Sequence, residues 1–270
     1  MSSAGANVTF NGGFLRLRIG TGTTGTPGFN IATGRTLTIS GVNTNSNVGT
    51  TNVSGGGMLS TLGTFTGSGT NRIALNVTTG TIAGTGTYLP NNTNGGFGVR
   101  VQTGSFVSPG VGGIGNLTFS GAGTAETLLQ MQAGAGLKFD LGTGGTFVTP
   151  GTSDLLTLAA AALNDVTFAN NNIDFLLSGS AGVFRLFDSD LAAAEGLDAY
   201  SGLTLTGQEI TGGLNVTNLA SGFTGKLFLG NGAAIGDLGD IYLQVTAVPE
   251  PSATLLGGIG MLFLLRRRRA

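Results

Sequence analysis

The sequence contains no cysteine, no histidine and no tryptophan, and only 9% of its 270 residues are charged. Without histidine and cysteine, most zinc sites, the catalytic triads and the thiol mechanisms are excluded. The absence of cysteine leaves the redox compartment open, because a protein without disulfides can be stable on either side of a membrane. We therefore expect no cofactor and no catalytic residue.

Charge is unevenly distributed, although the formal net charge is only −1. Residues 1–125 contain arginines and no acid, whereas all 13 acidic residues fall between positions 126 and 250. The few arginines are too widely spread to form a basic patch, so we expect no nucleic-acid partner. The split predicts a change of subdomain near residue 125, and electrostatic packing between neighbouring molecules is the alternative.

Glycine is abundant, with 51 residues, and the 40% hydrophobic content argues against a disordered chain. Short apolar segments alternate with Gly, Thr and Asn turns, and within them apolar and polar residues alternate with the period of 2 that is typical of strands. The predicted strands are residues 8–10, 14–19, 37–39, 73–77, 97–101, 117–119, 126–132, 137–141, 173–177, 183–187, 203–205, 226–229 and 241–245. The last two should close the sheet.

Internal repetition favours one β architecture over another. Residues 104–110 (GSFVSPG) recur 41 residues later as 145–151 (GTFVTPG), and Tyr88 in a shorter copy, 86–91, precedes Phe106 by 18 residues. These offsets correspond to two coils and one coil of about 20 residues, a period typical of stacked repeat folds. We therefore predict an all-β parallel β-solenoid (β-helix). An antiparallel β-sandwich or jelly roll is the alternative.

The predicted organisation has three parts. Residues 1–125 are Gly/Thr-rich solenoid repeats, residues 126–247 continue the β body and form an acidic cap, and residues 248–270 are a distinct tail. Within the second part, residues 159–163 predict a turn or short helix. Residues 188–195 predict a helix start, because Asp or Ser can cap the alanine-rich stretch that follows.

Two close pairs of acids are the candidate catalytic carboxylates of the body, Asp188 with Asp190 and Asp237 with Asp240. Such pairs can hydrolyse glycosides, but we identify for neither pair the arginine, lysine or aromatic platform that a sugar site needs. Residues 237–240 could also offer oxygen ligands to calcium, yet they match no known calcium loop. We interpret these acids as solvated loop residues and residues 237–240 as a turn or cap, and we predict no metal site.

The tail differs from everything before it. Two prolines, Pro249 and Pro251, fix their own φ and favour extended neighbours, which predicts an exposed elbow. Residues 253–265 are uncharged, and as a helix they would measure roughly 20 Å against a hydrocarbon core of about 30 Å. The arginines at 266–269 would stay in the cytoplasm, which places the body on the far side of the membrane. An apolar helix docked on the body, ending in solvated arginines, is the alternative.

The Pro-Glu-Pro elbow, the Leu/Gly-rich apolar run and the terminal arginines resemble, in this order, the PEP-CTERM sorting signal of Gram-negative bacteria. The resemblance implies that an exosortase, a membrane protease-transpeptidase, cleaves near the elbow and delivers the body to the cell surface or to an extracellular polysaccharide matrix. It implies a recognition element at Pro249, Glu250 and Pro251. It also implies a membrane anchor at Ala253, Leu255, Leu256, Ile259, Met261, Leu262, Phe263, Leu264 and Leu265, and a stop-transfer cluster at Arg266, Arg267, Arg268 and Arg269.

The body also resembles the Gly/Thr-rich, autotransporter-type repeats that often precede such tails. We therefore interpret the chain as an exported, non-enzymatic protein, anchored first in the inner membrane and then found at the cell surface or in a biofilm matrix with exopolysaccharide. Residues 1–7 lack the charged and apolar regions of a signal peptide, which we interpret as a truncated start. The alternatives are a β-helix polysaccharide-active enzyme, which a cluster of acids with Arg or Lys would favour, and an autotransporter adhesin passenger.

Overall fold

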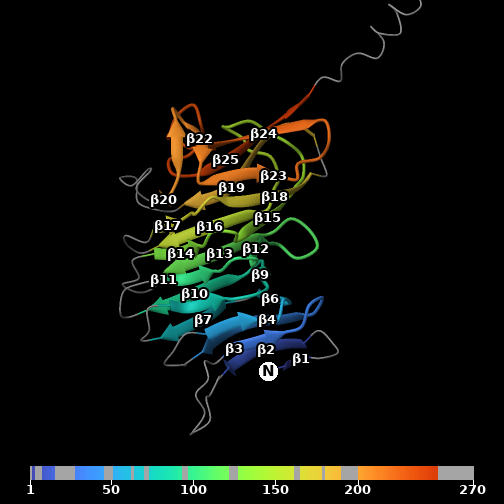
Figure 1. Cartoon of the computed structure of the whole chain (residues 1–270), viewed down its shortest axis with the longest axis vertical. Coiled ribbons are helices and arrows are strands. Elements are labelled where there is room, and N and C mark those ends of the chain that lie inside the picture. Colours follow the sequence, from blue (N-terminus) through green and yellow to red (C-terminus); the bar gives the residue numbers. More distant parts are fainter. Residues whose placement is uncertain are drawn as a thin grey trace, which may run out of the picture.

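The computed structural model describes residues 2–3, 8–15, 28–45, 51–61, 64–69, 73–92, 97–121, 127–160, 165–177, 180–189 and 200–248. Every regular element in these ranges is a β-strand, as the alternation predicted. The strands stack along the long axis of the molecule (Figure 1), from β1 (Ser2–Ser3) and β2 (Val8–Leu15) to β24 (Phe223–Leu229) and β25 (Ile241–Ala247).

Parallel hydrogen bonding joins most strands into three ladders. The first ladder is β1, β3 (Gly28–Ile31), β5 (Thr51–Ser54), β8 (Ile73–Val77), β11 (Phe97–Val101), β14 (Thr127–Met131), β17 (Asp165–Thr167) and β20 (Tyr200–Ser201). The second is β2, β4 (Thr36–Asn45), β6 (Met58–Thr61), β9 (Thr81–Gly84), β12 (Phe106–Pro109), β15 (Gly136–Leu141), β18 (Asn171–Leu177) and β23 (Leu214–Thr217). The third leaves the second half of β4 and continues through β7 (Thr64–Gly69), β10 (Thr87–Asn92), β13 (Asn116–Gly121), β16 (Leu155–Ala160) and β19 (Gly182–Ser189).

The chain visits the three ladders in a fixed order. From β5 to β19 each strand of the first ladder is followed by one of the second and then by one of the third. Each strand therefore pairs with strands one circuit earlier and one circuit later. This parallel arrangement differs from the antiparallel sandwich that the sequence left as the alternative.

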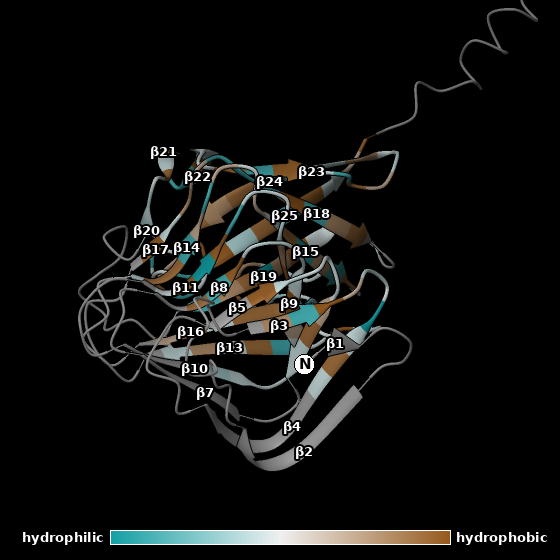
Figure 2. Ribbon diagram, turned by 60° about the horizontal axis from the view of Figure 1, so that its bottom comes forward, coloured by the Kyte–Doolittle hydropathy of each residue, from teal (hydrophilic) through white to brown (hydrophobic). Residues whose placement is uncertain are grey.

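The core consists of side chains stacked in register between circuits. In the second ladder Ile82 pairs with Val107, and Leu137 pairs with both Val107 and Ile173, and all four are fully buried. Alternation sends every second side chain of a strand to the same face, so register alone builds these apolar columns. Figure 2 shows hydrophobic residues concentrated on strands such as β18, β19, β24 and β25.

An aromatic column fills the inside of the third ladder. Tyr88 of β10 is paired with Phe119 of β13, and their ring centroids lie 5.7 Å apart. The Tyr88 hydroxyl donates to the main-chain oxygen of Leu59 at 3.0 Å, which satisfies the one polar atom of the ring. Burial raises the pKa of this phenol.

Glycine is required where successive circuits approach each other. Gly84, at the end of β9, has a φ of 124°, a conformation that residues with a side chain rarely adopt. A Cβ atom there would also collide with the main-chain oxygen of Thr61 in the preceding circuit. This position shows why a chain built of close-packed circuits is rich in glycine.

The repeat period of about 20 residues inferred from the sequence holds only near the N-terminal end and lengthens towards the C-terminal end. Stacked strands of neighbouring circuits are separated by 22 residues at Thr36 and Met58 and by 43 at Asn171 and Leu214. Phe106 lies in β12, whereas Phe147 lies in a loop and packs edge-on against Phe228, with 5.4 Å between centroids. The two similar segments therefore occupy different places, and the offset of 41 spans about one circuit.

Two segments that were predicted to form a turn or helix begin inside strands instead. Ala159 and Ala160 end β16, and Asp188 and Ser189 end β19, so the proposed helix start begins inside a strand. The remaining residues of both segments, 161–163 and 190–195, lie outside the described ranges.

The C-terminal end of the stack is closed by antiparallel pairing. β25 pairs antiparallel with β19 and with β24, and β24 continues to β22 (Glu209–Gly212) and β21 (Thr204–Thr206). This confirms the prediction that residues 226–229 and 241–245 close the sheet. We call β21, β22, β24, β25 and their loops the end layer.

Candidate functional site

The predicted tail begins where the described chain ends. Pro249, Glu250 and Pro251, the anchor residues 253–265 and the arginines 266–269 all lie outside the described residues. Within the ranges that are described, no helix is long and apolar enough to span a membrane. The structure therefore defines the body and the point at which the tail leaves it.

The tail leaves from the exposed end of β25. Ala247 is opposite Phe223 of β24, and the N–H of Val248 donates to the carbonyl oxygen of Gly222 at 2.8 Å. The strand is buried up to Val245, but Thr246, Ala247 and Val248 are exposed. In Figure 1 this red strand lies at the opposite end of the stack from the N-terminus. The body thus stays hydrogen-bonded up to the residue before Pro249.

The two chain segments that flank this exit carry no charged residue. No Asp, Glu, Lys or Arg occurs between Ile210 and Gly225, or between Ile241 and Val248. The nearest charged residues along these strands, Lys226 and Glu209, form an ion pair at 3.0 Å. The two segments at the exit are therefore uncharged themselves, and the neighbouring carboxylate of Asp174 accepts a hydrogen bond from the Asn218 amide at 2.9 Å.

A second candidate site is a cluster of acids around one arginine. Arg185 of β19 lies 3.5 Å from Asp188, 3.6 Å from Asp237 and 3.3 Å from Asp240. The sequence interpretation found no basic partner for these acids, and it was wrong on this point. Asp190 lies outside the described residues.

Within this cluster Asp240 has a structural position. Its side chain is only 2% exposed, and it accepts hydrogen bonds from the Ser189 N–H at 3.0 Å and the Tyr242 hydroxyl at 3.1 Å. Burial raises the pKa of Asp240, although the Ser189 N–H and Arg185 act in the opposite direction. Partial burial by itself lowers the pKa of Arg185, but the charges of Asp188 and Asp240 outweigh it and raise the pKa. Asp240 therefore fastens the loop before β25 to β19.

The arrangement does not resemble an oxygen cage for a cation. Residues 237–239 form a turn, as the sequence predicted, and the Asp240 carboxylate faces Arg185. In the part of the chain that the structure describes, no three acidic side chains gather closely enough to hold a metal ion. Asp237 is 83% exposed and Asp188 is 28% exposed, so both carboxylates are accessible from solvent.

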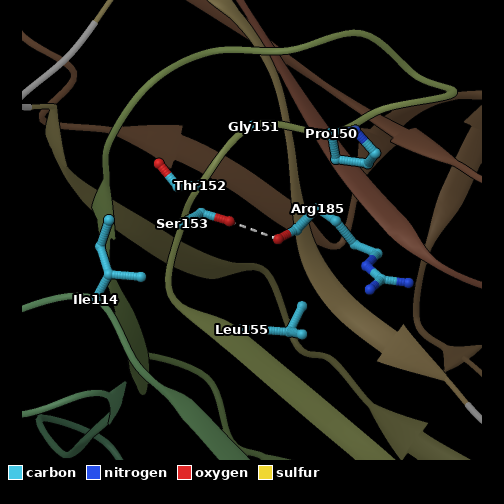
Figure 3. A pocket seen from close by; sticks show the side chains of 7 residues that line it. All are labelled: Ile114, Pro150, Gly151, Thr152, Ser153, Leu155 and Arg185. Atoms are coloured by element: carbon cyan, nitrogen blue, oxygen red, sulfur yellow. Dashed lines mark hydrogen bonds between the residues drawn. The ribbon is translucent and has the colours of Figure 1, made fainter.

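A pocket of about 250 Å³ lies beside Arg185, lined also by Ile114, Pro150, Gly151, Thr152, Ser153 and Leu155. The Ser153 hydroxyl donates to the main-chain oxygen of Arg185 at 2.7 Å, and the guanidinium extends away from this bond (Figure 3). Thr152 and Ser153 belong to the loop between β15 and β16, so this loop is fastened to β19.

Next to this pocket Asp154 is buried, and among the described residues no basic side chain forms an ion pair with it. It is 1% exposed, and its two carboxylate oxygens accept from the N–H groups of Gly115 and Asp140, each at 2.8 Å. Burial raises the pKa of Asp154 to about 6, although these two hydrogen bonds lower it. Sequence reasoning missed this residue. The one available signal is its place directly before the leucine-rich strand β16.

Comparison with known proteins identifies the tail. Residues 247–269 match the PEP-CTERM protein-sorting motif, which confirms the sorting signal predicted from the sequence. No curated protein and no solved structure is significantly similar to the chain. The comparisons therefore support the resemblance at the tail and lend no support to the autotransporter-like resemblance of the body.

Proposed function

We propose that this chain is an exported, non-enzymatic surface or matrix protein that an exosortase recognises at Pro249, Glu250 and Pro251 and cleaves near them. The observation that carries the proposal is the sorting-motif match at residues 247–269, which starts at the exposed end of β25. A processing enzyme needs an accessible, extended peptide, and the exit from the body supplies one directly before two prolines.

In this proposal residues 253–265 hold the precursor in the inner membrane, and Arg266 to Arg269 remain on its cytoplasmic side. The body then lies on the outer face until cleavage delivers it to the cell surface or to an extracellular polysaccharide. The position of β25 at one end of the stack supports this orientation, because the tail can leave without crossing the body.

We further infer that the body is a parallel β-solenoid that acts as a scaffold. The fixed order of the three ladders and the in-register apolar columns support this inference, since stacked circuits contact only their neighbours. A closed C-terminal end fits such a scaffold, because an open circuit would expose unpaired backbone groups.

Intact-mass measurement of the protein from cells that carry an exosortase tests the proposal. The wild-type chain should lose a tail-sized mass, and Glu250→Ala should keep its full length. Glu209→Ala, which changes a half-buried acid of the body that is paired with Lys226, serves as the control and should be processed like the wild type. Full-length mass for all three chains would refute processing at this motif.

The Arg185 cluster favours a second candidate, a β-helix polysaccharide-active enzyme. Asp188 and Asp237 are accessible carboxylates beside Arg185, and this arginine also lines a pocket of about 250 Å³. If the cluster is catalytic, Asp237→Asn should abolish cleavage of acidic or neutral polysaccharides in a reducing-end assay and leave the melting temperature unchanged. Absence of polysaccharide cleavage by the wild-type protein would favour the scaffold.

A further inference from the structure

Very few residues separate the sorting motif from the folded body. Ala247 and Val248 belong to the matched motif, yet Ala247 is paired with Phe223 and Val248 is hydrogen-bonded to Gly222. Only residues 249–252 separate this bond from the apolar run that starts at Ala253. Four residues span at most about 14 Å when fully extended. An enzyme that holds residues 249–251 must therefore come close to the body.

The body offers a neutral surface of mostly small side chains at this place. We define the exit surface as the exposed residues Asn218, Ala220, Ser221, Gly222, Thr224, Thr246, Ala247 and Val248. None of these residues is charged, and most have small side chains. The Asn218 amide donates to the half-buried carboxylate of Asp174 at 2.9 Å, so this neighbouring charge is already hydrogen-bonded. Close approach of another protein therefore requires no displacement of a large side chain.

We propose that the exit surface is a docking surface for the enzyme that processes residues 249–251. The inference rests on the proposed function, because it needs a processing enzyme, and it adds that this enzyme contacts the folded body as well as the motif. Two arguments carry it: the short span after Val248, and the absence of charge on both segments that flank the exit.

Matched substitutions at two exposed alanines test the docking surface. Ala220 lies on the exit surface, whereas Ala133 lies in an exposed turn between β14 and β15. Ala220→Arg and Ala220→Glu should each slow the appearance of the shortened chain by about tenfold, as the loss of an interface contact does. Ala133→Arg and Ala133→Glu should be processed at the wild-type rate. Melting temperatures of all four variants show whether the body remains folded.

A linker separates contact with the body from damage to the motif. A Gly-Ser insertion of about eight residues between Val248 and Pro249 lets the motif reach the enzyme without the body. It should restore the processing of Ala220→Arg to the rate of the wild-type chain with the same insertion. Continued slow processing of the extended variant would overturn the proposal, because the substitution would then act elsewhere.

The sign of the effect distinguishes an enzyme from a lipid surface. If the exit surface instead faced anionic lipid headgroups, Ala220→Arg would accelerate processing and Ala220→Glu would slow it. Opposite effects of the two substitutions would therefore overturn docking on a protein, and so would wild-type rates for both.

A disulfide crosslink that can be reduced tests whether the end of β25 must detach from β24 before the enzyme can cleave the chain. Phe223 and Ala247 are opposite each other in a pair without mutual hydrogen bonds, and the chain has no other cysteine to compete. Under the docking proposal, Phe223→Cys with Ala247→Cys should be processed equally fast when oxidised and when reduced, with wild type in the same reductant as the control. Much slower processing of the oxidised form would overturn docking in favour of strand opening. Failure of the proposed function is separate, since it would leave even the wild type unprocessed.

Discussion

The parallel stack and the end layer are stabilised in different ways. In the stack, buried aliphatic residues such as Val107 and Leu137 pair with their equivalents one circuit away. In the end layer, Leu227 and Leu243 also form a buried pair, between neighbouring strands. There, particular partners are added: Asp240 with Arg185, and Phe147 with Tyr242, whose ring centroids are 5.9 Å apart. Apolar columns accept many residues of similar size, whereas a polar cluster needs each donor and acceptor in place.

The two buried aspartates make the same contrast. Among the described residues, Asp154 and Asp240 are the acids whose side chains are buried. Asp240 faces Arg185 and two further donors, whereas Asp154 has only two main-chain N–H groups. The end layer thus contains a paired charge, and the stack contains an unpaired carboxyl group that is more easily protonated.

Removal of Asp240 should give the largest loss of stability. Asp240→Ala would leave the Ser189 N–H and the Tyr242 hydroxyl without their acceptor and Arg185 without its buried partner. We expect the free energy of unfolding to fall by about 3–5 kcal/mol, measured by chemical denaturation. Asp237→Ala, at an 83% exposed side chain beside the same arginine, should change it by less than about 0.5 kcal/mol. Similar losses of stability in both variants would contradict the conclusion that Asp240 fastens the loop before β25 to β19.

A cavity in the stack should lower the free energy of unfolding somewhat less than the removal of Asp240 does. Leu137→Ala removes a fully buried side chain between Val107 and Ile173, and we expect a loss of about 3 kcal/mol in the same denaturation experiment. Leu176→Ala on the neighbouring strand β18 is the control, because Leu176 is 67% exposed and should be nearly neutral. A larger loss at Leu137 than at Asp240 would reverse the proposed order of the two regions.

About half of the strands could be predicted from the sequence, because their signal is local. Residues 73–77 and 97–101 coincide with β8 and β11, since alternation alone reports which face of a strand is buried. The parallel pairing was predicted correctly, but from a repeat that the structure does not use. Phe106 and Phe147 share a sequence context and not a structural position, because register is set by buried columns and loops vary in length.

The same distinction between local sequence signals and contacts made only by the fold applies to the candidate sites. The sorting motif was predicted because it is contiguous, and the match at residues 247–269 confirms it. The Arg185 cluster was missed because Asp237 and Asp240 lie more than fifty residues from it and are brought together only by the β19–β25 pairing. All three ladders continue across residue 125, and the division expected there stays a prediction.

The smallest effect should be a pH dependence of the free energy of unfolding, caused by the buried carboxyl group in the stack. The raised pKa of Asp154, about 6, means that the folded state binds a proton more tightly than the unfolded chain does. The resulting stability is fully present below about pH 4 and is lost as the pH rises through 6, by about 3 kcal/mol in total and by about 2 kcal/mol between pH 4.5 and 7. Unfolding free energies of the wild type at pH 4.5 and 7 should show this decrease, and Asp154→Asn should flatten it. Asp240, whose pKa is also raised, leaves a residual slope of the same sign in that variant. An unchanged slope in Asp154→Asn would assign the whole pH dependence to the end layer and remove the contrast between the two carboxyl groups.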